Sequence, residues 1–237
     1  MTSSPNNWLE WWETENIITH ATWLNNMEIF VTASDSLLHY DSQDIILDIG
    51  CGPGYLAAFL KDRVKEIHCL DTSQRYLDLC RDKFAKDKNV FIYKLSKDNY
   101  TDLSLVKNKK FSIIICQSVI QYYKAVNEVE KLIEEVRRIA LPGARFLIAD
   151  IPITNNILLL AYGLLKTALR KGRLSEVAKL LFQIATSKYR KAYSSLRLLV
   201  FSDEELSGLI DKLGLNAQIL SMKLTCNDNR RHLLIRF

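Results

Sequence analysis

Residues 48–54, "DIGCGPG", combine side chains and a spacing that suit a ligand-binding loop. An apolar run ends at Asp48, and Gly50, Gly52 and Gly54 follow at alternate positions. Glycines allow tight turns and let the backbone approach a bound molecule closely. We therefore expect this loop to hold a ligand against its backbone, with the carboxylate of Asp48 at its start.

The kind of ligand follows from what the loop lacks. A phosphate-binding GxxxxGK[ST] loop needs a lysine that is absent here, and a dinucleotide-binding loop needs a small residue where this chain has Tyr55. The carboxylate of Asp48 would repel a pyrophosphate, and Pro53 has no backbone N–H to donate. The loop thus favours a ligand that carries positive charge and no phosphate.

The elements that must position this loop alternate along the chain. Short β-rich runs predict strands over residues 44–50, 66–71, 89–95, 111–117, 144–151, 216–222 and 231–237. Helical patterns begin at residue 55, span 72–84, run from 127 to a stop at the "LPG" of 141–143, and span 202–214. This order predicts an α/β, Rossmann-like, doubly wound sheet of seven mostly parallel strands, with an N-terminal helical extension and a helical insert after the fifth strand.

A sheet of this kind brings distant residues to one edge. Ligands bind beyond the carboxyl ends of the strands, next to the first strand, where the strand order reverses. We expect the glycine loop, Asp71 and the segments that follow Leu95 and Cys116 to meet at this rim.

Four motifs, in this order, resemble those of the class I S-adenosylmethionine-dependent methyltransferase family. They are "DIGCGPG", "LDTSQRYLDLC", "FSIIICQSVIQYY" and "EEVRRIALPGARFLIAD". The resemblance covers roughly residues 44–151 and, more loosely, 202–237. It implies S-adenosylmethionine as cofactor and S-adenosylhomocysteine as product. The four histidines lie far apart in sequence, so no metal site is expected.

The resemblance also implies which residues contact the cofactor. They are Asp48, Gly50, Cys51, Gly52, Gly54, Asp71, Thr72, Tyr76, Ser96, Lys97 and Gln117. The carboxylate of Asp71 is expected to accept bonds from the ribose hydroxyls. One position departs from the family pattern, because many members carry an acid at the end of the third strand, near the adenine amino group. Here Ser96 or Lys97 falls at that position, with Asp98 close behind.

The implied reaction is transfer of the methyl group to an O, N or C nucleophile of a small or medium-sized acceptor, such as a metabolite, natural product, glycan or lipid-like molecule. His20 and Asp150 are candidates for a catalytic acid or base, and Gln121, Tyr122 and Trp12 for substrate contacts. Two alternatives stay open. The chain could be a catalytically silent adenosylmethionine-binding partner subunit, or it could methylate a protein or RNA.

Residues 153–200 form the most individual segment. It carries nine Lys and Arg residues and one acid, in a chain whose net charge is +5. Its amphipathic pattern predicts a helical insert. It suits a lid over the substrate, a docking element for an anionic surface or an acidic carrier protein, or a homodimer contact.

We expect four parts in the chain. They are an N-terminal helical cap (1–43), an adenosylmethionine-binding core (44–152), the helical basic insert (153–200) and a C-terminal helix with two strands that complete the sheet (201–237). The N-terminus lacks a signal-peptide pattern and the apolar runs are too short to span a bilayer. The five cysteines show no CxxC spacing, so reduced thiols and a cytoplasmic location are expected.

Overall fold

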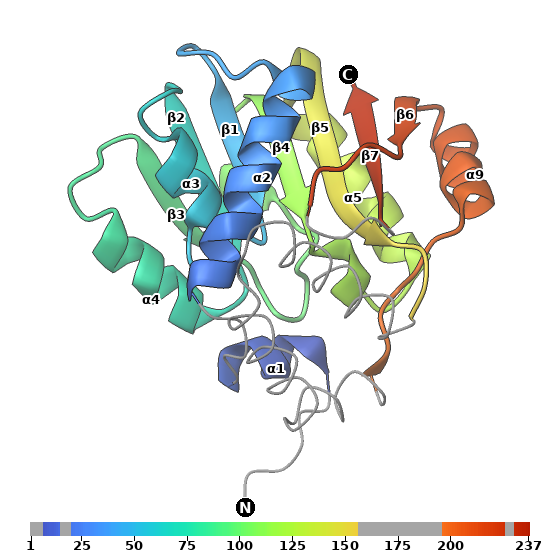
Figure 1. The fold of residues 1–237 in the computed structure, drawn as a ribbon, viewed down its shortest axis with the longest axis horizontal. Helices are drawn as coiled ribbons and strands as arrows, with labels where there is room; N and C mark the ends of the chain where they lie inside the picture. The colour runs from blue at the N-terminus through green and yellow to red at the C-terminus, as the bar shows by residue number, and fades with distance from the viewer. Residues whose placement is uncertain (1–6, 15–19, 156–195, 226–229) are drawn as a thin grey trace, which may run out of the picture.

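The computed structural model describes residues 7–14, 20–155, 196–225 and 230–237 (Figure 1). Its elements in chain order are α1 (Trp8–Thr14), α2 (His20–Leu38), β1 (Ile45–Ile49), α3 (Tyr55–Leu60), β2 (Glu66–Asp71), α4 (Gln74–Lys83), β3 (Val90–Lys94), the 3-10 helix η1 (Ser104–Val106), β4 (Phe111–Gln117), the 3-10 helix η2 (Ile120–Tyr122), α5 (Val126–Ile139), β5 (Ala140–Pro152), α9 (Asp203–Leu213), β6 (Asn216–Leu220) and β7 (Arg230–Arg236).

Within these residues the seven strands form one sheet in the order β3-β2-β1-β4-β5-β7-β6. All neighbours pair in parallel except β7, which runs antiparallel to β5 and β6. The order reverses beside β1, so the carboxyl ends of β1 and β4 are adjacent at the switch point. The predicted doubly wound, mostly parallel sheet of seven strands is therefore confirmed.

Helices cover both faces of the sheet (Figure 1). Alternate strand residues point to opposite faces, and each set meets its own helices. Ile46, Ile67 and Ile115 pack with α2, α3 and α4. Leu47 and Ile114 pack with α5 and α9 on the other face. The central strands are buried on both faces of the sheet. Their near-continuous apolar sequences suit this burial, whereas a strand with one exposed face would alternate apolar and polar residues.

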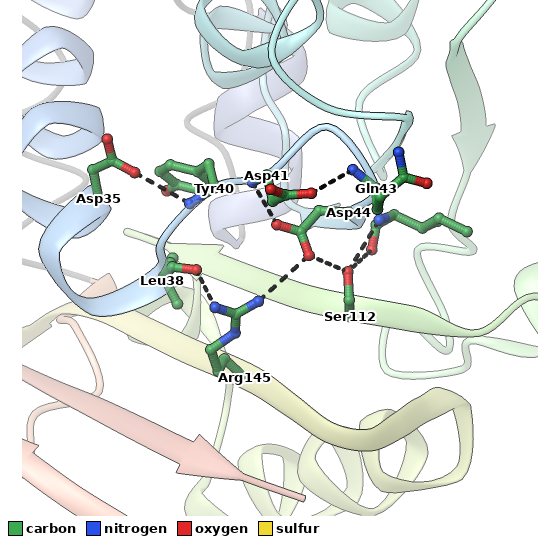
Figure 2. A network of polar contacts seen from close by, with 9 residues as sticks. Asp35, Leu38, Tyr40, Asp41, Gln43, Asp44, Ser112 and Arg145 are labelled. Atoms are coloured by element: carbon green, nitrogen blue, oxygen red, sulfur yellow. Dashed lines mark hydrogen bonds and ion pairs between the residues drawn. The ribbon is translucent and has the colours of Figure 1, made fainter.

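A network of polar contacts anchors the C-terminal end of α2 to the sheet (Figure 2). The guanidinium of Arg145 on β5 donates to the carbonyl of Leu38 and lies 3.4 Å from Asp44 Oδ1. Ser112 on β4 donates to the same carboxylate at 2.7 Å and accepts the N–H of Ile45 at 3.0 Å. These contacts join α2 to the starts of β1, β4 and β5, at the edge opposite the carboxyl ends.

The fixed C-terminal end directs the rest of α2 across the sheet. Figure 1 shows the helix running from the edge where the parallel strands end to the edge where they begin. Phe30 and Leu38 are fully buried against the sheet side of α2. The start of α2, at His20, therefore lies on the side of the molecule where the ligand loop is found.

The fifth strand begins earlier than its sequence predicts. The helix stops before "LPG" as expected, but residues 141–143 belong to β5 and do not form a separate turn. Ala140 pairs with Phe111, and the N–H of Gly143 donates to the carbonyl of Phe237 at 2.6 Å. These partners are distant in sequence, so a local pattern of proline and glycine could not reveal the extension.

The predicted helical insert falls largely on residues 156–195, which lie outside the described residues. Its two described ends meet, because the side chain of Asn155 bonds both the N–H and the carbonyl of Leu198. Among the helices that the structure describes, none combines the length and apolarity that crossing a bilayer requires.

Candidate active site

Gly52 is the open position of the glycine loop. Its φ is 52°, and a Cβ built there meets no atom of the described residues within 4 Å. By contrast, a Cβ on Gly50 would lie 2.3 Å from Val119 Cγ2, and one on Gly54 would lie 2.7 Å from a ring carbon of Phe84. The outer glycines are thus required for packing, whereas Gly52 leaves room for a ligand against the backbone.

Asp71 ties the loop to the end of β2. One carboxylate oxygen accepts the N–H of Gly52 at 2.8 Å, and the other accepts the N–H of Ser73 at 2.8 Å. Burial raises the pKa of Asp71, although the backbone N–H donors oppose that shift. A carboxylate has about four acceptor positions, so this one can still accept from a ligand. Thr72, which stands between Asp71 and Ser73 in the sequence, is half-buried.

Asp48 is a second buried carboxyl at the same place. Its residue is 4% exposed, and Oδ2 has no hydrogen-bond partner among the residues that the structure describes. Burial, and then the charge of Asp71, raise its pKa to about 8. A buried acid held without a cation is an unbalanced arrangement, and a positively charged ligand would relieve it.

Cys51, between the first two glycines, is a packing residue. Hydrogen bonds with Cys69 and Cys80, together with burial, raise the pKa of its thiol well above the usual range. Cys80 Sγ also donates to the carbonyl of Gly52 at 3.3 Å. The neutral thiol is therefore suited to fixing the loop and is a poor nucleophile.

Helix α1 lies beyond the carboxyl ends of the parallel strands (Figure 1). The ring of Trp12 packs 5.4 Å from that of Tyr122 and 6.3 Å from that of Tyr76, measured between centroids. Trp8 packs 5.2 Å from Tyr122 and donates its indole N–H to the carbonyl of Arg197 at 2.8 Å. The helix thus connects Tyr76 of α4 with Tyr122 of η2.

The end of β3 is the most solvent-exposed part of the predicted site. Ser96 and Lys97 are both exposed, and Ser96 Oγ accepts the N–H of Asp98 at 3.2 Å. Lys97 Nζ lies 2.9 Å from Glu13 Oε1 of α1. The same oxygen accepts the N–H of Gln74, the first residue of α4, at 3.1 Å.

At the end of β4, the side chains of Gln117 and Ser118 differ in their hydrogen bonding. The side-chain carbonyl oxygen of Gln117 is buried and unpaired within the described part of the chain. Ser118 has a φ of 58°, and Asp150 at the end of β5 has a φ of 64°. Ser118 Oγ donates to Asp150 Oδ2 at 2.6 Å. Left-handed backbone at two bonded non-glycine residues is rare, and such residues concentrate at functional sites.

Asp150 is held by further partners from the C-terminal part of the chain. Thr225 donates to its Oδ1 at 3.0 Å, and Arg230 Nε lies 3.3 Å from the same oxygen in an ion pair whose geometry is not that of a hydrogen bond. Its backbone N–H donates to His232 Nδ1 at 3.1 Å. Burial lowers the pKa of His232 to about 4, so this imidazole is neutral and can accept.

Gln121 belongs to the same network and is buried. Its amide donates to the carbonyl of Ser118 at 3.3 Å and accepts from Arg230 Nη1 at 3.1 Å. Arg230 is itself 7% exposed. Both ends of the Gln121 amide are therefore occupied by protein, whereas Tyr122 and Trp12 remain partly exposed beside it. A substrate contact by these three residues stays a prediction.

The structure brings most of the predicted residues together. The glycine loop, Asp71, Tyr76, Gln117 and Asp150 all occupy the rim, and α1 carries Trp12 to it. His20 begins α2 on the same side, but its side chain lies outside the described residues. Sequence reasoning missed Glu13, Thr225 and Arg230, because no local spacing links them to the motif residues that they contact.

Comparisons with known proteins agree with this geometry. Residues 47–148 match the model of a family described as a methyltransferase domain. Chondramide synthase cmdD of Chondromyces crocatus is 30% identical over 154 residues, or 63% of this chain. The chain spans 4% of the length of that relative.

Two solved structures show the same fold. The N-methyltransferase NodS of Bradyrhizobium japonicum WM9 in complex with S-adenosylhomocysteine aligns with a TM-score of 0.58 and 14% identity, covering 98% of each chain. A DhpI–S-adenosylhomocysteine complex aligns with a TM-score of 0.61 and 13% identity, covering 96% of this chain and 94% of that one. At these identities the likeness concerns the fold.

The residues of the rim fit S-adenosylmethionine as the cofactor of such a domain. The open Gly52 offers backbone contact, Asp48 offers an unbalanced buried carboxyl to a cationic ligand, and Asp71 retains acceptor capacity. The polar atoms Trp12 Nε1, Tyr76 Oη and Gln117 Oε1 are likewise buried without partners in the described chain. The match of residues 47–148 to a methyltransferase domain family, the methyltransferase-like fold and these groups agree with one another.

Proposed function

We propose that this chain transfers the methyl group of S-adenosylmethionine to an O, N or C nucleophile of a small or medium-sized acceptor. The observation that carries the proposal is the pair of buried carboxyls, Asp48 and Asp71, beneath the open backbone of Gly52. The charge of Asp71 contributes to the raised pKa of Asp48. Such a site suits a ligand with a cationic methionine end and a neutral nucleoside end.

When bound, the cofactor supplies an electrophilic methyl group on its sulfonium. The chain's own residues then have to bind the cofactor, orient it toward the acceptor and enclose both. Asp48 balances the positive charge, Asp71 accepts from the ribose hydroxyls, and Gly52 permits close approach. Trp12 and Tyr122 cover the rim and limit access of water. Holding a nucleophile in line with the methyl group can lower the barrier by roughly 7–11 kcal/mol.

The residues proposed for proton transfer differ in their surroundings. Asp150 already accepts from Ser118 and Thr225 and pairs with Arg230, which suits its carboxylate to holding the strand ends together. His20 starts α2 on the correct side of the sheet. An acceptor that needs no protein base, such as a neutral amine, would make both roles unnecessary.

The size of the acceptor is supported by the relative and by the rim. The name chondramide synthase refers to a product, which favours a small-molecule reaction over methylation of a protein or RNA. The rim is also covered at η2, because Trp8 and Trp12 of α1 pack against Tyr122 and Leu199 donates to the carbonyl of Gln121 at 2.9 Å. The roles proposed for that segment are a lid, a docking element for an anionic surface or acidic carrier, and a homodimer contact.

Two measurements test the proposal. Calorimetry with S-adenosylhomocysteine should show binding to the wild-type chain at a ratio of one to one. Incubation with S-adenosylmethionine and a small-molecule fraction of cell extract should then produce S-adenosylhomocysteine and a product heavier by one methylene group, detected by mass spectrometry. Turnover only with the macromolecular fraction would contradict the acceptor class. Binding without turnover in any fraction would identify a silent partner subunit instead.

A further inference from the structure

The end of β3 lacks the acid that the fold places there in many methyltransferases. Ser96 and Lys97 occupy the position, and both are exposed. Asp98 is exposed as well, and its N–H bonds to Ser96. The core of this chain therefore offers no shielded carboxylate, among the described residues after β3, at the point where the nucleoside end of the cofactor would lie.

Helix α1 brings a carboxylate to this point from outside the core. Glu13 Oε1 lies 2.9 Å from Lys97 Nζ and accepts the N–H of Gln74 at 3.1 Å. The side chain of Glu13 is 21% exposed, against 44% for Lys97. Glu13 thus stands between the end of β3 and the start of α4, on the more shielded side of the ion pair.

The charge of Glu13 acts on two of the predicted cofactor residues. Its charge contributes to the raised pKa values of Asp71 and Tyr76. Burial opposes ionisation of Glu13 itself, but the bonds to Lys97 and Gln74 outweigh burial and leave its pKa below the usual range. Glu13 is therefore an ionised acceptor at neutral pH.

Two buried polar groups without partners belong to the same two helices, α1 and α4, that Glu13 joins. Trp12 Nε1 and Tyr76 Oη have no hydrogen-bond partner among the described residues, and Tyr76 is 5% exposed. Their rings are 6.3 Å apart between centroids and inclined at 46°. Buried donors and acceptors are normally satisfied, so two unpaired groups from two elements suit a polar ligand at this place.

We propose that Glu13 is a cofactor-binding residue, whose carboxylate accepts the amino group of adenine in place of the acid absent from the end of β3. The inference rests on the proposed function. Lys97 holds the carboxylate in position, and α1 thereby becomes part of the cofactor site as well as its cover. The site then recognises an amino group and disfavours a carbonyl oxygen at the same ring position, because two acceptors repel each other.

The test compares two ligands that differ at that position, S-adenosylhomocysteine and S-inosylhomocysteine. Calorimetry on the wild-type chain should show a preference for the adenine ligand of roughly ten- to a hundredfold, the range for one hydrogen bond to a charged group. Glu13→Gln should remove at least a roughly tenfold part of this preference, since an amide can also donate to the hypoxanthine oxygen. The matched control is Glu10→Gln, an exposed carboxyl on the same helix.

The ratio of the two affinities separates recognition from stability, because a loosened α1 weakens both ligands equally. A preference unchanged in Glu13→Gln, or one lost instead in Asp98→Asn, overturns the assignment of Glu13 while leaving the proposed function intact. A wild-type chain that binds neither ligand overturns the proposed function itself. Retained preference in Glu10→Gln, with loss in Glu13→Gln, supports the inference.

Discussion

Replacing Asp48 by asparagine tests whether the buried carboxyl lowers the free energy of unfolding while it serves to bind the ligand. Burial and the charge of Asp71 raise the pKa of Asp48 from its usual 3.8 to about 8. Between these values the unfolded chain has released the proton that the folded protein keeps. Stability due to this group therefore falls as pH rises from about 4 to about 8, and then levels off. At about 1.4 kcal/mol for each pH step, the loss is roughly 5 kcal/mol.

An asparagine side chain at this position would keep the shape without the charge, so Asp48→Asn should abolish this loss. We expect the variant to match the wild type near pH 4 and to exceed its free energy of unfolding by up to roughly 5 kcal/mol at about pH 8, or roughly 10–20 °C in Tm. Urea unfolding followed by tryptophan fluorescence from about pH 4 to 9 measures the difference. Asp98→Asn, at an exposed carboxyl, is the control. Parallel stability curves for wild type and Asp48→Asn would refute the reasoning.

The Asp48→Asn substitution also tests whether binding of the ligand releases a proton from Asp48. At pH 7 the free protein holds a proton on Asp48, and a cationic ligand favours the ionised form. Binding of S-adenosylmethionine should then release close to one proton, and Asp48→Asn should release none and bind about tenfold more weakly. Calorimetry in two buffers of different ionisation enthalpy reports the proton. Wild-type binding at pH 7 without proton release would contradict a role for Asp48 in balancing charge.

Three further predictions concern the rim. Asp71→Ala should lower the affinity for S-adenosylhomocysteine about ten- to a hundredfold in calorimetry, and an unchanged affinity would remove this residue from the site. Gly52→Ala should lower the free energy of unfolding by about 1–2 kcal/mol, because the backbone there is left-handed, and should weaken cofactor binding more than about tenfold. Gly50→Ala should lower the free energy of unfolding further in urea, and adding Val119→Ala to that variant should restore part of the loss. Arg230→Met should cost about 3 kcal/mol, because the carboxylate that it pairs with loses its cation, and Arg230→Lys should cost less; equal losses in the two variants would show that charge is not the cause.

Much of the fold could be predicted because its signals are local. The apolar residues at 46, 47 and 49 in β1 and at 113–116 in β4 are buried on both faces of the sheet, and such burial favours a nearly continuous apolar strand. The capping box at Ser202 forms as its spacing indicates, with Ser202 Oγ accepting the N–H of Glu205. The extension of β5 to Ala140 was missed, because its partners Phe111 and Phe237 are remote in sequence.

The site divides in the same way. Asp48, the glycines and Asp71 directly end or follow strands, so the amino-acid sequence alone determined that they converge at the switch point of a parallel sheet. The sequence also indicated that the loop suits a cationic ligand, because Asp48 and the three glycines stand within seven residues of one another. The tertiary structure decided that Glu13 reaches Lys97 and Gln74, and that Arg230 and Thr225 surround Asp150. The physical reason is that ion pairs and hydrogen bonds between distant segments depend on how helices and strand ends pack, and no spacing along the chain records that packing.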